Sequence, residues 1–116
     1  MNTKQLTKEQ AFEAIRKGEF GRDVTSSNHK VAIIMTQDWC SEWKAMKQWI
    51  DAMEEHRDID IYELIYNRVD YFEDFLKLKE KSWTNNLIPY VRYYSEGVLI
   101  HESNYVTREV FFRFLH

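Results

Sequence analysis

The fold is decided by the stretch Val31-Ala32-Ile33-Ile34-Met35-Thr36-Gln37-Asp38-Trp39-Cys40-Ser41-Glu42-Trp43-Lys44. It opens with an uninterrupted apolar run, rich in β-branched side chains, which predicts a strand covered on both faces. Downstream of Cys40, the residues Trp43, Met46, Ile50 and Met53 recur at helical spacing and form one apolar stripe. The stretch therefore predicts a buried strand that leads into an amphipathic helix, with Cys40 at the start of the helix.

Regular elements are predicted on both sides of this stretch. Thr7 and Gln10 form the pattern of a capping box and predict a helix over about residues 7–17. The remaining predicted elements are a possible short strand within Thr3–Leu6, a strand around Ile59–Tyr66, a helix from Asp70 to about Leu78, strands Tyr90–Tyr94 and Val98–Glu102 joined by a turn at Ser95-Glu96-Gly97, and a helix from about Thr107. This order predicts an α/β protein: a three-layer α/β/α sandwich whose mixed central sheet is parallel in its first half and ends in an antiparallel hairpin.

The length and composition limit the classes of protein that the chain can be. A chain of 116 residues has room for one domain, which we expect to span residues 1–116, and its 44% of hydrophobic residues argues against disorder. The net charge of −3, without a basic cluster, argues against nucleic acid as a partner. The longest apolar run, Val31–Met35, is far shorter than the roughly 20 residues of a membrane-spanning helix, so no membrane association is expected.

The compartment is predicted from the start of the chain and from its cysteine content. Residues 1–6 lack the apolar segment of a secretory signal, which predicts a cytoplasmic protein. Cys40 is the one cysteine of the sequence, so no internal disulfide can form, in agreement with a reducing compartment.

Cys40 is the candidate for chemistry because of where it stands. At the start of a helix, unpaired backbone N–H groups and the helix dipole favour an anion and therefore a nucleophilic thiolate. Lys44 acts in the same direction, whereas Asp38 and Glu42 oppose a thiolate by like-charge repulsion. The alternative is a structural role as a small buried apolar side chain. The junction of strand and helix favours the reactive role.

Two segments carry a resemblance to a known family. Val31–Lys44 resembles the strand, Trp-Cys-x-x-Cys-Lys loop and helix of the thioredoxin family. Leu87–Gly97, which contains Ile88-Pro89, is similar to the family's segment of cis-proline, strand and glycine hairpin. The resemblance covers nearly the whole chain and implies a thioredoxin-like fold, with Cys40 as the attacking cysteine and Pro89 as the cis-proline beside it in space.

The resemblance also implies a substrate groove. Ile88, the residue before the proline, would present its backbone to an extended substrate peptide, and Trp39 would form part of an apolar rim. Trp43 leaves two alternatives open. It either joins Trp39 in an exposed patch of the groove or lies in the core as the first residue of the helix's apolar stripe.

The departures from the family pattern limit the predicted chemistry. Trp43 stands where the family has its resolving cysteine, so Cys40 cannot close an intramolecular disulfide. Glu42 replaces the proline of the motif, and Ile34 replaces the buried acid of the strand. The predicted function is monothiol thiol–disulfide exchange with a protein or low-molecular-weight thiol or disulfide as partner. Of the two elements that hold glutathione in monothiol glutaredoxins, one is replaced by Leu87-Ile88-Pro89 and the other is not recognisable, so glutathione specificity is not supported. No cofactor is predicted.

The competing hypothesis is a non-catalytic thioredoxin-fold module, in which the groove beside Trp39, Trp43, Ile88 and Pro89 binds a peptide or protein. In that case Cys40 is a remnant. No metal site is predicted, because the four histidines are scattered without ligand spacing: His29, His56, His101 and His116. The sequence leaves the oligomeric state open.

Overall fold

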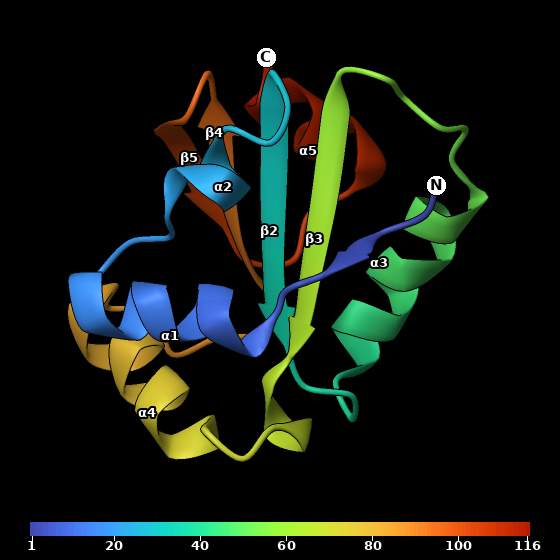
Figure 1. The fold of residues 1–116 in the computed structure, drawn as a ribbon. Coiled ribbons are helices and arrows are strands. Elements are labelled where there is room, and N and C mark those ends of the chain that lie inside the picture. The colour runs from blue at the N-terminus through green and yellow to red at the C-terminus, as the bar shows by residue number, and fades with distance from the viewer.

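The computed structural model describes residues 1–116 and places five strands in one sheet (Figure 1). The strand order is β1-β3-β2-β4-β5. β1 and β2 both pair parallel with β3, whereas β4 pairs antiparallel with β2 and with β5. The strands are β1 (Lys4–Gln5), β2 (Lys30–Thr36), β3 (Ile59–Ile65), β4 (Tyr90–Ser95) and β5 (Val98–Ser103). The mixed sheet predicted from the order of elements, including its C-terminal hairpin, is confirmed.

Helices cover both faces of the sheet, as Figure 1 shows. Successive residues of a strand point to opposite faces, and in β2 Val31, Ile33 and Met35 pack in one core cluster while Ala32 and Ile34 pack in the other. The first cluster includes residues of α1 (Lys8–Lys17), α2 (Arg22–Thr25) and α4 (Phe72–Lys77), and the second includes residues of α3 (Ser41–Ala52) and α5 (Arg108–Leu115). The result is the expected three-layer α/β/α sandwich.

Local sequence signals set several helix ends. At the start of α1, Thr7 accepts a hydrogen bond from the Gln10 backbone and the Gln10 side chain accepts one from the Thr7 backbone, so the predicted capping box is formed. Gly18 ends the helix in the left-handed region, at φ 78°, where glycine is favoured. Thr107 caps α5 through a bond from the Val110 N–H.

Three short elements differ from the prediction. The helix expected from Asp70 to Leu78 begins at Phe72 and continues after Lys77 as a π-helical segment, η2 (Leu78–Ser82). The short helix α2 and the 3₁₀ turn η1 (Tyr66–Arg68) were not expected, because elements of three or four residues are too short to show a hydrophobic period. None of the helices combines the length and the hydropathy that crossing a membrane requires.

One carboxylate within the sheet connects three elements. Glu63 of β3 is buried and accepts hydrogen bonds from Thr3 Oγ1 (2.9 Å), Gln5 Nε2 (3.0 Å) and Lys47 Nζ (3.0 Å). Burial by itself raises the pKa of Glu63, but the bonds from Gln5, Lys47 and Thr3 outweigh it and hold the pKa below the usual 4.5. The ionised carboxylate therefore stabilises the attachment of the N-terminal strand and of α3.

Glu63→Gln is expected to lower the free energy of unfolding at pH 7 by about 1–2 kcal/mol, because a neutral amide replaces a charged acceptor. The folded pKa is depressed, so this stabilisation is present above pH 4.5 and is lost as the pH falls through the folded pKa. Urea unfolding at a series of pH values checks this. The difference between the variant and the wild type should shrink towards pH 3, and the exposed Glu54→Gln serves as the control. A difference that stays constant with pH would contradict the role given to Glu63.

Candidate functional site

Cys40 occupies the N-cap of α3, directly after the loop that leaves β2. Its N–H donates to the Gln37 carbonyl at 3.2 Å, and its own carbonyl accepts from the Lys44 N–H at 3.1 Å, which starts the helix. The side chain does not cap the helix, and its sulfur points instead to the Ile88 carbonyl, with 3.7 Å between Sγ and O. Cys40 is 6% exposed. The sulfur therefore lies just beneath the surface, against another loop.

Ile88 and Pro89 come from a segment 48 or more residues away in the chain, and the peptide bond between them is cis. Pro89 is buried directly before β4, while Ile88 is half-buried and packs against both core clusters. The structure thus brings Cys40, Ile88 and Pro89 together at the end of the sheet where β2 ends and β4 begins. This is the arrangement that the resemblance implied for these three residues.

The two tryptophans near Cys40 have different environments. Trp39 is 64% exposed, and its Nε1 donates to Gln37 Oε1 at 2.5 Å. Trp43 is 4% exposed and belongs to the core cluster beneath α3, so the patch that would join both rings is not formed. Leu87 is the other large apolar side chain exposed here, at 60%. Trp39 and Leu87 are the chain neighbours of Cys40 and Ile88, so exposed apolar surface flanks the contact of sulfur and carbonyl.

Asp38 is held by the turn that follows β3. Its N–H donates to Asn67 Oδ1 at 3.1 Å, Asn67 Nδ2 donates to Asp38 Oδ1 at 2.8 Å, and Arg68 forms an ion pair with the same carboxylate. The bonds from Asn67 and Arg68 lower the pKa of Asp38, so the group is ionised at neutral pH. Arg68 therefore balances one of the two negative charges that the sequence places near Cys40, and the bonds to Asp38 attach the loop to η1.

Comparison with known proteins assigns the architecture. No protein family model matches the sequence, and no curated protein matches it. Among solved structures, thioredoxin f from spinach chloroplast is 18% identical, with a TM-score of 0.65 over 96% of this chain and 88% of that one. Oxidised thioredoxin from Plasmodium falciparum is 14% identical, with a TM-score of 0.61 over 99% and 100% of the two chains. A putative oxidoreductase with a thioredoxin fold is 14% identical, with a TM-score of 0.65 over 98% and 94%.

The chain has the thioredoxin fold. Within this fold, Cys40 is the sole thiol, and Trp43 fills the space one helical turn further along α3 with a buried ring. Ile34, where the resemblance to the thioredoxin family leads one to expect an acid, is fully buried among apolar side chains. The chain therefore has no second thiol, and position 34 supplies no buried carboxylate.

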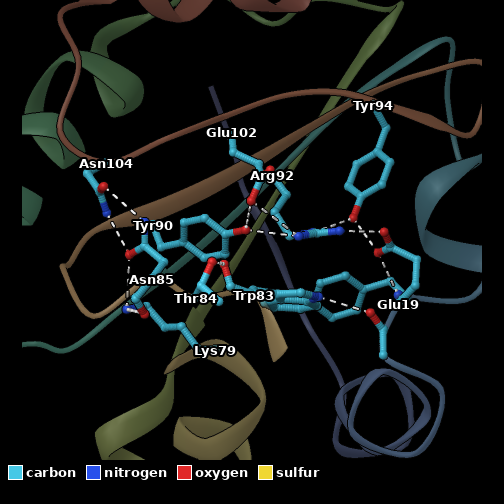
Figure 2. Close-up of polar contacts among 12 residues, drawn as sticks. Glu19, Lys79, Trp83, Thr84, Asn85, Tyr90, Arg92, Tyr94, Glu102 and Asn104 are labelled. Carbon is cyan, nitrogen blue, oxygen red and sulfur yellow. Dashed lines mark hydrogen bonds and ion pairs between the residues drawn. The ribbon is translucent and has the colours of Figure 1, made fainter. Parts of the chain in front are cut away.

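Sequence reasoning missed a group of polar side chains that hold the loop before Pro89. Lys79 of η2 and Asn104, which follows β5, both bond to this loop (Figure 2). Lys79 is fully buried and Asn104 is half-buried. No local pattern could have found them, because a lysine in the charged run Lys77-Leu78-Lys79-Glu80-Lys81 is expected at the surface.

Arg92 of β4 forms a second buried polar centre that sequence reasoning missed. Its guanidinium donates to the hydroxyls of Tyr94 (2.9 Å) and Tyr90 (2.9 Å) and to Glu19 (2.5 Å), and it lies 4.1 Å from the centroid of the Trp83 ring (Figure 2). The sequence did contain a signal. Tyr90, Arg92 and Tyr94 alternate along one strand and therefore share one face of the sheet.

Arg92 thereby links the loop before β4 to the end of α1. Trp83, which stacks on the guanidinium, donates its Nε1–H to the Gly18 carbonyl at 2.9 Å, and Glu19 pairs with Arg92 directly. Cation–π contacts of this kind contribute most when they are desolvated, and the Arg92 side chain is only 5% exposed. The segment that carries Ile88 and Pro89 is thus attached to the end of α1 through Trp83 on one side and through Arg92 on the other.

Arg92→Leu is expected to lower the free energy of unfolding by about 3 kcal/mol, because the change leaves Glu19 and two tyrosine hydroxyls without their buried donor. Urea unfolding measures the loss, and the fluorescence of the tryptophans reports the release of Trp83. Arg16→Leu, on the exposed side of α1, is the matched control and should change stability by less than about 0.5 kcal/mol. Equal stabilities for both variants would refute a structural role of the Arg92 centre.

Proposed function

We propose that the protein is a monothiol thiol–disulfide exchange protein in which Cys40 is the nucleophile. The observation that carries this proposal is the meeting of Cys40 Sγ with the Ile88 carbonyl, at the start of α3 and between exposed apolar side chains. The thioredoxin fold supports it, since solved structures with similar architecture include thioredoxins. A reducing compartment such as the cytoplasm suits a protein whose single thiol needs external thiols.

The exchange needs one cysteine and one partner disulfide. The Cys40 thiolate attacks one sulfur of a disulfide R–S–S–R′, a bond forms between Cys40 Sγ and that sulfur, and R′S⁻ leaves with the electron pair. A second thiolate from outside then attacks the mixed disulfide and releases Cys40 as a thiolate. In the first step Cys40 is oxidised to a mixed disulfide and R′S⁻ is the reduced product; the second thiolate then reduces Cys40 again and is itself oxidised. No other oxidant or reductant and no resolving cysteine from this chain is required.

The start of α3 offers hydrogen-bond donors to a thiolate at Cys40. A thiol can donate to the Ile88 carbonyl, but a thiolate has no hydrogen to give, so the ionised sulfur must turn to other partners. The N–H groups of Glu42 and Trp43 lie in the first turn of α3, where no side chain caps them. These donors and the helix dipole favour the negative charge that the attack requires.

The surroundings of Cys40 suit an extended peptide as partner. Trp39 and Leu87 offer apolar surface on the two loops that meet at the sulfur, and Ile88 has backbone groups at the same place. Pro89 has no N–H of its own, so backbone pairing with a substrate would fall to Ile88. A low-molecular-weight disulfide would reach the sulfur without using this surface.

The chemistry is tested with oxidised glutathione, used here as a simple disulfide probe. Wild-type protein is expected to gain one glutathione adduct on Cys40, seen by mass spectrometry of the intact chain and of its peptides, and to lose it on addition of dithiothreitol. Cys40→Ser removes the nucleophile and should form no adduct. Wild-type protein that forms no adduct at pH 8 over hours, while an unfolded sample does, would exclude a reactive thiol in the native state.

A second candidate function is favoured by the burial of the sulfur. Cys40 is only 6% exposed, whereas Trp39 and Leu87 are among the most exposed large apolar side chains of the protein. Exposed aromatic side chains are frequent anchors of protein interfaces. In this function the thioredoxin fold serves as a binding module for a peptide or protein, and Cys40 packs the start of α3.

The two functions predict opposite effects on partner binding. For a binding module, Trp39→Ala is expected to weaken capture of a selected peptide at least tenfold, with Ile88→Ala behaving similarly, while Cys40→Ser leaves the affinity unchanged. Fluorescence anisotropy of peptides selected from a display library measures these affinities. Val98→Ala is the matched control, because Val98 is also 64% exposed but lies on the edge strand β5. Loss of capture with Cys40→Ser alone would favour the monothiol function.

A further inference from the structure

A buried lysine lies behind the loop that covers Cys40. Lys79 is fully buried in the π-helical segment η2, and its Nζ donates to the carbonyls of Leu87 (2.6 Å) and Asn85 (3.0 Å) and to Asn85 Oδ1 (3.4 Å) (Figure 2). None of the ion pairs of the structure includes Lys79. All hydrogen bonds of its Nζ go to the loop. This is unusual, because a lysine side chain is rarely buried without a carboxylate partner.

Asn104 holds the same loop from the end of β5. Its Nδ2 donates to Asn85 Oδ1 (3.0 Å), to the Pro89 carbonyl (3.0 Å) and to the Leu87 carbonyl (3.3 Å), while its Oδ1 accepts from Asn85 Nδ2 (3.1 Å). The carbonyls on both sides of Ile88 are therefore held by side chains. The Ile88 carbonyl is the one left for the sulfur of Cys40.

We propose that Lys79 is a positioning residue of the Cys40 site: it holds the carbonyls of Asn85 and Leu87 so that the backbone of Ile88 faces the sulfur. The inference rests on the proposed function only in assuming that a peptide partner pairs with the backbone of Ile88. The geometry of the loop itself does not depend on any chemistry at Cys40. π-Helical turns are often retained at functional sites, and η2 is the segment that turns Lys79 beneath the loop.

The charge of Lys79 is sensitive to pH in the range where proteins work. Burial lowers the pKa of Lys79 to about 8, and Glu80, its neighbour on η2, opposes this only in part. From β4 the ring of Tyr90 faces the ammonium, with 5.7 Å between Nζ and the ring centroid, and burial raises the pKa of that hydroxyl, so Tyr90 stays neutral. Asn85 and Asn104 are neutral groups. No other charge compensates the ammonium from these elements.

The sign of the pH effect follows from linkage. When the loop opens, water returns to the ammonium and its pKa moves back towards 10.5. Between about pH 8 and 10.5 the open form then binds more protons than the closed form, so rising pH favours the closed loop and protonation favours opening. A lysine that only filled space in a rigid core would give no such response at the loop.

The experiment measures amide–water exchange at Asn85 and Leu87 by NMR between pH 7 and 9.5, corrected for intrinsic exchange rates. In the wild type the protection factors are expected to rise about tenfold between pH 8 and 9.5. In Lys79→Met they are expected to be lower at every pH and independent of pH, because the loop has lost its donor and its titrating group. Lys81→Met, an exposed lysine of the same π-helical segment, should behave as the wild type.

A second readout is alkylation of Cys40 by iodoacetamide at a single pH. Lys79→Met is expected to react several-fold faster than the wild type and than Lys81→Met, because the loosened loop uncovers the sulfur. If Lys79→Met does not fold, Lys79→Gln keeps a side-chain NH₂ group that can donate to the loop carbonyls, without the charge. It should keep Leu87 protected and abolish the pH dependence.

The outcomes separate the two proposals. Wild-type protection factors and pH dependence in Lys79→Met, or wild-type pH dependence in Lys79→Gln, would overturn the positioning role even if Cys40 forms glutathione adducts. Absence of the adduct would overturn monothiol exchange but leave the loop measurements standing. Loss of both protection and pH dependence in Lys79→Met, with Lys81→Met unchanged, supports the positioning role.

Discussion

The site depends on the antiparallel pairing of β2 with β4. In this register Met35, near the end of β2, lies opposite Tyr90, the first residue of β4. Because the two strands run in opposite directions, the loop that follows β2 and the loop that precedes β4 meet at the same end of the sheet. Cys40 lies in the first loop and Ile88 in the second, so a contact between residues 48 positions apart follows from the pairing.

The core buries three charged side chains, and two of them hold the segment before β4. Glu63, Lys79 and Arg92 are the acid and the two bases that the core contains. Glu63 and Arg92 have oppositely charged partners, whereas Lys79 bonds only to oxygens of neutral groups. An uncompensated charge lowers stability relative to an apolar side chain of similar size. Its presence directly behind the Cys40 site fits a protein that gives up some stability for the geometry of one loop.

The burial of two side chains narrows the chemistry of the site. Trp43 fills the core beneath α3, so its ring is withdrawn from the groove and the exposed apolar surface there comes from Trp39 and Leu87. The sulfur of Cys40 lies beneath the Ile88 backbone and must become accessible before it can attack a disulfide. In the proposed exchange, the loop that carries Ile88 controls access to the sulfur, and a bound peptide would contact the same loop.

The sequence by itself determined the architecture, because alternating apolar patterns and capping residues act over a few neighbouring positions. It also predicted, through the resemblance, that Cys40, Ile88 and Pro89 would lie together. Only the tertiary structure decided whether the Trp43 ring is buried, because its position in the apolar stripe of the helix was compatible with both the core and the groove surface. The same holds for Lys79, which bonds to the loop at Leu87, and for Arg92, which bonds to Glu19 far away in the chain. Such bonds leave no periodic signal in the sequence, since a polar side chain becomes a buried donor only when packing brings its acceptors to it.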